Sequence, residues 1–377
     1  MQQHDYLTRE QGQIQQRSIN TDPRETGSGY PSQGGWQTRQ RRRSPARTLI
    51  ICLGALVVAA LIAWLTGGFS FSSIQKTLPT RSFVLNGHGT LVVNEASGTL
   101  HVHKGTTNQV IVRGSEYAYG LTSSINNLQV QYTQNGNTIT VSSNESWSLI
   151  GGSGLNLDVT VPASIDVALH DSSADATINN VAGQINASTS SGNLNLDNTN
   201  GPLNLGTSSG NITIINEQGP ISAHTSSGNL HLENTSGTLN LGTSSGNIAI
   251  TNEQGSSSAQ TSSGDIRINQ LSGPVNLSTS SGNITLDQAQ LSGQDHLQTS
   301  SGDIHFNGTL DPQGSYQMET TSGSITVKLP ASASFQLNTS SNSGSLHNDF
   351  AANASGTAPY ARIEMKTSSG DMYIQKQ

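Results

Sequence analysis

Cysteine is almost absent from this chain: the only one is Cys52, inside an apolar run. No disulfide can form within the chain, so its stability must come from other contacts. Reversible acylation of Cys52 is an alternative role. We favour the simpler interpretation, in which the thiol is an inert apolar side chain.

Charged and aromatic residues are also scarce, at 11% and 5% of the 377 residues, while Gly, Ser, Thr and Asn dominate the second half. That leaves too little large apolar material for an ordinary globular core of this length. The composition suits either a thin coil or a disordered chain. Strict placement of Leu and Ile in the second half favours the coil.

Basic residues are scarce beyond residue 47. Residues 1–47 carry eight arginines and four acidic residues, whereas the remainder carries nine basic and twenty acidic residues. Nucleic-acid binding needs a clustered basic face. We therefore predict no nucleic-acid partner for the C-terminal part.

Residues 48–66 form an uncharged apolar segment, from Thr48 to Thr66. As a helix it would be about 28 Å long, close to the thickness of a bilayer's hydrocarbon core. We predict a transmembrane helix here. A cleaved signal peptide is the alternative, but its apolar region is usually shorter and its leading segment far shorter than 47 residues.

A basic cluster that includes Arg41, Arg42, Arg43 and Arg47 precedes this segment. Such a flank stays in the cytoplasm, so the chain is predicted to be a single-pass protein of the bacterial cell membrane with an extracytoplasmic C-terminal part. The segment 48–66 and these arginines are the predicted contacts with membrane lipid. The rest of 1–47 is polar and without an apolar period, which predicts a disordered tail.

The most regular feature of the chain is the phrase Thr-Ser-Ser-Gly. A constant period of this length is typical of a solenoid, whose coils cannot bury their apolar sides alone. The phrase ends every 18 residues at Gly192, Gly210, Gly228, Gly246, Gly264 and Gly282, and the pattern continues at Gly302, Gly323, Gly344 and Gly370.

Within one coil, 192–209, Leu194 and Leu196 form one apolar pair and Leu203 and Leu205 another. A spacing of two is the strand period. Gly192 and Gly201 mark the corners, because glycine accepts backbone angles that other residues avoid. The sequence therefore predicts an all-β fold: a parallel β-solenoid of two-strand coils.

The predicted layout has four parts: the tail 1–47, the transmembrane helix 48–66, a stalk over 67–82 and the solenoid 83–377. Within the solenoid we expect irregular coils over 83–165, regular coils over 166–309 and longer coils over 310–377. The irregular regions are expected to cap the ends, since a bare terminal coil exposes a strand edge.

The strand Val159-Thr160-Val161, ended by Pro162 and followed by serial Thr-Ser-Ser-Gly-(Asn/Asp)-(Ile/Leu) turns, resembles the bacterial putative-adhesin family. These are membrane-anchored β-strand-repeat domains of unknown function, and the resemblance covers about 83–377. It implies an extracytoplasmic β-solenoid linked to adhesion or envelope stress, and it brings no catalytic residues. The Gln- and Arg-rich tail departs from simple members.

Some solenoids are enzymes that act on polysaccharides, and glycoside hydrolysis needs two carboxylates. Asp265 and Asp303 occupy a turn position that usually holds Asn, and we interpret them as substitutes for Asn in that turn. His101 and His103 share a strand face, but two ligands are too few for a metal site. We predict no catalytic residue, no metal site and no cofactor.

A ladder of Thr and Ser along the coils is a candidate surface for a glycan, a cell-wall polymer or ice. If Leu203 and Leu205 point inward, Thr207 and Ser209 share their parity, so only Ser208 points outward. A corner at Gly206 would reverse the inward and outward directions of Thr207, Ser208 and Ser209.

The prediction is a non-catalytic adhesin or cell-envelope module with a surface glycan or protein as partner, and self-association is left open. A β-helix enzyme acting on polysaccharide and a binder of repetitive surfaces are the alternatives.

Overall fold

Segments of alternating apolar residues form short strands, and each strand stacks on the equivalent strand of the next coil. The structure is a computed structural model that describes residues 54–58, 72–95, 97–120, 129–143 and 151–377. The chain divides into two units, Met1–Ala63 and Trp64–Gln377. In the first unit residues 54–58 are helical, and the rest of the predicted tail and of the segment 48–66 lies outside the described residues. Among the described residues, no helix is long and apolar enough to cross a membrane.

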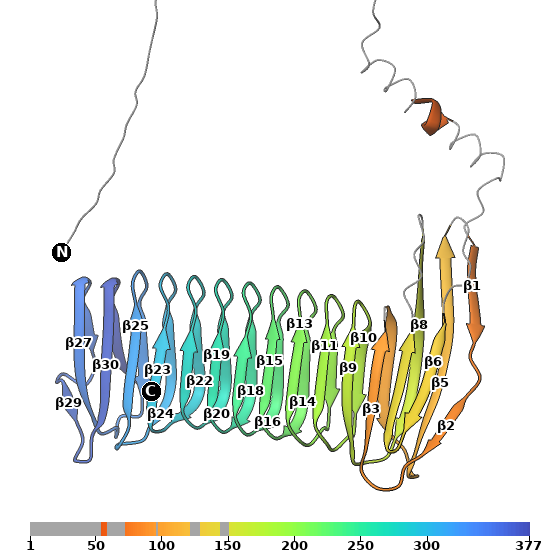
Figure 1. The fold of residues 1–377 in the computed structure, drawn as a ribbon. Helices are drawn as coiled ribbons and strands as arrows, with labels where there is room; N and C mark the ends of the chain where they lie inside the picture. Colours follow the sequence, from red (N-terminus) through yellow and green to blue (C-terminus); the bar gives the residue numbers. More distant parts are fainter. Residues whose placement is uncertain (1–53, 59–71, 96, 121–128, 144–150) are drawn as a thin grey trace, which may run out of the picture. The chain divides into compact units, whose positions relative to one another are not determined.

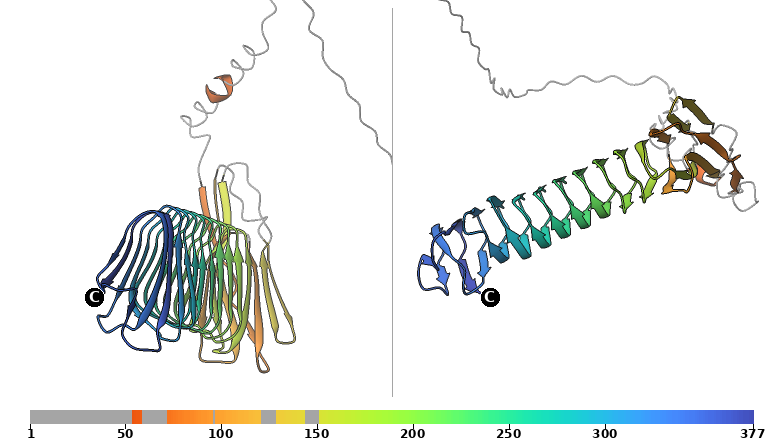
Figure 2. Two further views of the ribbon diagram at one scale, coloured as in Figure 1. Left: turned by 90° about the vertical axis from the view of Figure 1, so that its left-hand side faces the viewer. Right: turned by 90° about the horizontal axis from the view of Figure 1, so that it is seen from below.

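The second unit is a β-solenoid built from two large sheets, whose stacked coils follow one another in Figure 1. Each regular coil contributes one strand to each sheet, and equivalent strands of successive coils pair in parallel, as the two further views in Figure 2 make clear. The fold class predicted for this part of the chain, an all-β parallel solenoid, is confirmed.

The parallel strands of the first sheet, sheet A, are β4 (Gly98–Lys104), β8 (Gly151–Val161), β10 (Asp175–Asn179), β12 (Leu194–Asp197), β14 (Ile212–Gln218), β16 (Leu230–Ser236), β18 (Ile248–Gln254), β20 (Ile266–Ser272), β22 (Ile284–Leu291), β24 (Ile304–Leu310), β26 (Ile325–Leu329), β28 (Leu346–Asn348) and β31 (Met372–Lys376). Its strands with antiparallel pairing are β1 (Ser72–Thr77), β2 (Arg81–Val84) and β5 (Gln109–Gly120). Part of the segment expected as a stalk, 67–82, is therefore strand.

The parallel strands of the second sheet, sheet B, are β3 (Gly89–Glu95), β7 (Thr138–Ser143), β9 (Ile165–Asp171), β11 (Ile185–Thr189), β13 (Leu203–Thr207), β15 (Ile221–Thr225), β17 (Leu239–Gly242), β19 (Ser257–Gln260), β21 (Val275–Ser278), β23 (Gln294–Gln298), β25 (Ser315–Thr320), β27 (Phe335–Ser343) and β30 (Ala361–Ser369). The strands β6 (Val130–Asn135) and β29 (Ala354–Ser355) pair antiparallel with β7 and β27.

The core is a stack of aliphatic side chains between the two sheets. Leu203 and Leu205 of sheet B and Ile212 and Ile214 of sheet A are at most 2% exposed. Each residue lies in register with its equivalent one coil away, so Leu203 pairs with Ile221. Burial of each of these aliphatic side chains stabilises the fold by about 1.5–3 kcal/mol. Summed over one coil, this is small compared with the conformational entropy lost when about 18 residues become ordered.

Glycine closes the two corners of a coil for different reasons. Gly201 has a φ of 139°, as predicted for a residue with unusual backbone angles. Gly192 does not have such backbone angles, because its φ lies outside the left-handed region. A Cβ there would lie 1.8 Å from the carbonyl oxygen of Ala174 in the preceding coil. The Thr-Ser-Ser-Gly glycine is thus required by the close approach of successive coils, not by its backbone angles.

The order of the coils departs from the order of the sequence at both ends of the stack. The first coil along the chain, β3 and β4, lies between the β7–β8 coil and the β9–β10 coil. The last coil along the chain, β30 and β31, lies between the β25–β26 coil and the β27–β28 coil. Each of these coils is therefore paired on both sides, and a coil from further inside the sequence covers it.

Candidate functional site

The Thr-Ser-Ser-Gly corner is held by the threonine hydroxyl. Thr225 Oγ1 accepts a hydrogen bond from the backbone N–H of Gly228 at 3.1 Å and donates one to the carbonyl oxygen of Gly210 at 3.1 Å. The same pair of contacts recurs in successive coils, for example at Thr207 and Thr243. The threonine column therefore links each coil to the one before it from inside.

Both serines of the phrase are exposed. In the coil that contains Leu203 and Leu205, Thr207 is buried whereas Ser208 and Ser209 face solvent. The expectation that Ser209 continues the inward parity was wrong, because the chain turns after Thr207 and not after Gly206. The corner presents two rows of serine without an outward row of threonine.

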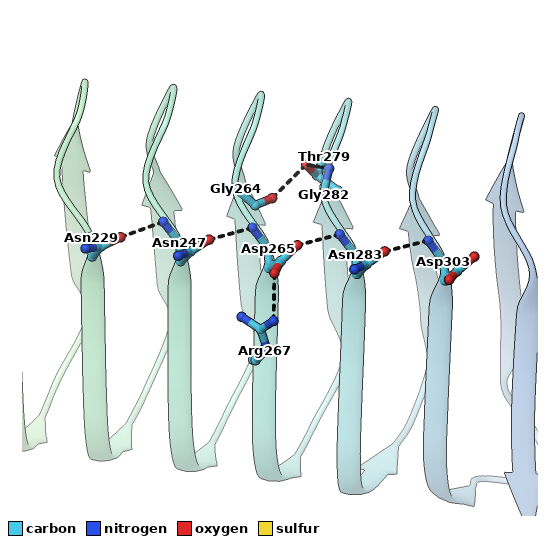
Figure 3. A network of polar contacts seen from close by, with 9 residues as sticks. All are labelled: Asn229, Asn247, Gly264, Asp265, Arg267, Thr279, Gly282, Asn283 and Asp303. Atoms are coloured by element: carbon cyan, nitrogen blue, oxygen red, sulfur yellow. Dashed lines mark hydrogen bonds and ion pairs between the residues drawn. The ribbon is translucent and has the colours of Figure 1, made fainter.

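Asp265 and Asp303 belong to a ladder of Asn and Asp side chains that immediately follows the Thr-Ser-Ser-Gly corner (Figure 3). Each side-chain oxygen accepts the backbone N–H of the equivalent residue in the next coil. Asn247 Oδ1 accepts from Asp265 at 2.8 Å, and Asp265 Oδ1 accepts from Asn283 at 2.8 Å. Asp265 Oδ2 also pairs with Arg267 at 2.7 Å.

This geometry supports the interpretation of both aspartates as substitutes for asparagine. Asp303 Oδ1 accepts the N–H of Ser324 at 2.8 Å, as an asparagine would. One carboxylate oxygen of each aspartate accepts a ladder N–H, and the second oxygen of Asp265 pairs with Arg267.

His101 and His103 lie on β4, on the outward face that they were expected to share. His103 contacts Asp158 at 3.4 Å and the hydroxyl of Thr160 at 3.2 Å, both on β8. Within the described part of the chain, no three His, Cys, Asp or Glu side chains come together in a way that could hold a metal ion.

A second polar ladder lies at the opposite corner, where each sheet A strand bends. At this point a non-glycine residue adopts a left-handed backbone, with φ between 53° and 59°. Asparagine tolerates this conformation better than most residues. The residues at the bend are Asn180, Asn198, Asn216, Asn234, Asn252, Gln270 and Gln288.

Near the C-terminal end of the stack, this corner borders a groove of about 1330 Å³. Its lining includes the bend residues Asn252, Gln270 and Gln288 and the exposed Gln254 and Gln290 just beyond the bend. We call this surface the amide groove. Lys328, Asp349 and residues 375–377 also line it, and they come from the longer C-terminal coils.

The groove holds two carboxyl groups among its lining residues, Glu253 and Asp349. Glu253 is buried within the coil, where burial raises its pKa and a hydrogen bond from Thr235 opposes that rise. Asp349 is bonded through its N–H to the carbonyl of Ile374 on β31. The strands β18 and β31 are five strand steps apart, about 24 Å along the stack.

Paired glycosidase carboxylates lie about 5–9.5 Å apart. The two acids of the amide groove therefore do not form such a pair.

An aromatic pair lies on the outer face of β28 and β31, and neither of its residues lines the amide groove. Tyr373 and His347 stack with their ring centroids 4.8 Å apart and an interplanar angle of 11°. Tyr373 lies two residues before Gln375 on β31, so both side chains point to the same outer face. The Tyr373 hydroxyl donates to Asp371 Oδ2 at 3.3 Å, next to the Thr-Ser-Ser-Gly corner, so the ring is directed away from the groove.

Sequence reasoning did not single out the amide groove. One signal was available, because an Asn or Gln stands six residues after the Thr-Ser-Ser-Gly glycine in coil after coil, as at Asn198, Asn216 and Asn234. The remaining lining residues, such as Lys328 and Asp349, carry no repeat signal.

The fold and these ladders define a β-solenoid repeat module. The chain belongs to the family described as Toastrack DUF4097, whose model matches residues 88–288 and 218–375. This confirms the resemblance to a putative-adhesin family of unknown function. No curated protein sequence matches the chain.

Three solved structures share limited similarity with the chain. A putative cell adhesion protein from Clostridium sporogenes has 10% identity and a TM-score of 0.18, covering 82% of this chain and 100% of its own. A putative adhesin from Parabacteroides distasonis has 11% identity and a TM-score of 0.31, covering 82% and 98%. A putative adhesin from Bacteroides fragilis has 14% identity and a TM-score of 0.25, covering 80% and 97%.

Proposed function

We propose that this chain is a single-pass membrane protein that displays a non-catalytic, adhesin-type solenoid outside the bacterial cytoplasmic membrane and binds surface partners through the amide groove. The observation that carries the binding role is the groove itself. It is about 1330 Å³ in volume and is lined mainly by side chains that donate and accept hydrogen bonds.

The anchoring half of the proposal is supported by the sequence. The uncharged segment 48–66 has the length of a membrane span, and Arg41, Arg42, Arg43 and Arg47 lie on its N-terminal flank. In this arrangement the arginines bind anionic headgroups at the cytoplasmic face. The solenoid carries more acidic than basic residues, which suits an exported module better than a nucleic-acid binder.

Binding is favoured over catalysis because of where the acids lie. Asp265 and Asp303 are occupied in the ladder, and Glu253 and Asp349 are too far apart to act as a hydrolytic pair. A polysaccharide-acting enzyme would need a converged pair of carboxylates in a cleft.

Two measurements test the proposal. Protease added to intact cells that produce the full chain is expected to digest the solenoid and spare an epitope tag at the N-terminus; the reverse pattern would refute the orientation.

Cells that display the full chain are expected to attach to cell-wall preparations or partner cells more than cells that display a variant lacking residues 72–377. Equal attachment would refute the adhesin role, and attachment only among the producing cells would identify self-association as its basis.

A further inference from the structure

We propose that the amide groove binds a neutral, linear polysaccharide that lies along the solenoid axis. This inference rests on the proposed function as a binding module and assigns its ligand class. It follows from the side chains that line the groove and from their repetition along the stack.

The lining matches the hydrogen-bonding character of sugar hydroxyls. A hydroxyl both donates and accepts, and an Asn or Gln side chain does the same from one planar group. Lys328 and Lys376 are offset in part by Asp349 among the lining residues. Lys376 Nζ also lies 5.1 Å from the centre of the Phe350 ring. The groove therefore lacks the dense positive charge that a polyanionic chain would require.

Polar groups repeat along the axis of the groove. Just beyond the bend, Gln254, Ser272, Gln290 and Thr309 lie in register on four successive strands. Neighbouring strands are about 4.8 Å apart, so a polymer of small repeating units meets a new polar group at each coil. Several weak contacts on one chain then combine, which raises the overall affinity.

A peptide partner fits this surface less well. The apolar residues of the lining, Leu271 and Ala289, are buried in the core, so they offer no pocket for an apolar anchor. The strands beneath the groove are paired on both sides, so they offer no free edge to which a peptide strand could add.

The test uses the purified full chain in detergent and fluorescently labelled hexasaccharides. The neutral probes are linear glucan, mannan and xylan fragments, and the acidic probe is hexagalacturonate. At least one neutral probe is expected to bind, and the double variant Gln254→Ala/Gln290→Ala is expected to weaken that binding about tenfold or more, since each amide loses one or more hydrogen bonds.

Gln218→Ala is the matched control. Gln218 occupies the same place in its coil as Gln254 and is exposed, but it does not line the groove. The control is expected to bind like the parent chain, and equal melting temperatures for all variants show that the fold is kept.

Failure to bind any neutral probe, binding of the acidic probe alone, or neutral binding that the groove variant leaves unchanged would each overturn the inference. Attachment of cells that persists after such a result would leave the adhesin role standing and would place its ligand in another class. Loss of both glycan binding and attachment would overturn both proposals.

Discussion

Glu95 lies directly opposite Asp171 in the register of β3 and β9, at the position that threonine holds in the regular coils. Glu95 is only 5% exposed, and neither of its carboxylate oxygens receives a hydrogen bond from a described residue. Burial, with the nearby Asp171 charge as a second cause, raises the pKa of Glu95 to about 9. Burial raises the pKa of Asp171 to about 7, although the backbone N–H of Ser172 opposes the rise.

These shifts predict that the N-terminal end of the solenoid loses stability as the pH rises. A carboxyl whose pKa is higher in the folded state stabilises the fold fully below its unfolded pKa, which is near 4.5 for Glu95. That contribution declines as the pH rises from there towards 9, by up to about 1.4 kcal/mol per pH unit. Tyr117, which also faces Glu95, titrates above this window because burial raises its pKa too.

The variant Glu95→Gln should remove the part of this dependence that Glu95 contributes, whereas Asp171 keeps its own part. The amide keeps the shape of the protonated acid and cannot ionise, so the variant should melt at a higher temperature than the parent at pH 8 and at a similar temperature at pH 4.5. Thermal melts from pH 4.5 to 9 measure this. A parent melting temperature that is flat or rises across this window would contradict the pKa directions.

Gly228 and Gly206 should respond very differently to the same substitution. A Cβ on Gly228 would lie 1.7 Å from the carbonyl oxygen of Gly210, whereas a Cβ on Gly206 would meet nothing within 4 Å. Gly228→Ala should therefore reduce the free energy of unfolding by about 3 kcal/mol, because two stacked backbones must move apart. Gly206→Ala should change it by less than about 0.5 kcal/mol. Urea unfolding measures both, and equal effects would mean that the spacing of the coils does not require the corner glycine.

The alternation of Leu and Ile was enough to predict the coil, because a period of two within each half and a fixed repeat leave few other folds. The corner at Ser209 could not be predicted, since Ser208 and Ser209 are chemically equal and only the hydrogen bonds of Thr207 place the turn. The order in which the coils stack at the two ends also could not be predicted from the sequence. Ala361–Ser369 and Phe335–Ser343 both alternate, and local sequence does not state which of them pairs with β25.

The amide groove was missed for a related reason. Asn252 and Gln288 show their left-handed backbone only in the structure. Lys328, Asp349 and Gln377 reach the groove through contacts between segments far apart in the sequence, such as the hydrogen bond from Gln377 Nε2 to Asn307 Oδ1 at 2.8 Å. The role of Asp265 was predictable from its neighbours, because every equivalent position that holds Asn makes the same turn.

Asp265→Asn should leave the solenoid almost unchanged. The ladder uses one side-chain oxygen of Asp265 to accept the N–H of Asn283, and asparagine has the same acceptor. The lost ion pair with Arg267 is partly exposed and is worth about 0–1 kcal/mol. Asp265→Ala removes the acceptor and should cost about 1 kcal/mol more. Chemical denaturation of the two variants separates these outcomes, and a large loss of stability in the Asn variant would show that the negative charge itself is needed.

Deletion of the last coil should disturb more of the chain than it removes. Without residues 361–377, β27 and β28 lose their parallel partners β30 and β31. Residues 330–360 should therefore become sensitive to protease although they are still present, as mass spectrometry of a limited digest would detect. Removal of one regular 18-residue period, residues 228–245, keeps the register and is the control. Equal protease resistance of 330–360 in both variants would contradict the observed coil order.

The position of the first and last coils beneath their covering neighbours has a mechanical consequence. A solenoid wound strictly in sequence could unzip from a free end, one ladder at a time. Here the first and last coils are each paired on both sides, so neither coil can leave the stack until hydrogen bonds on two flanks break. A pull on the first or the last coil is therefore resisted on as many flanks as a pull on a coil in the middle of the stack.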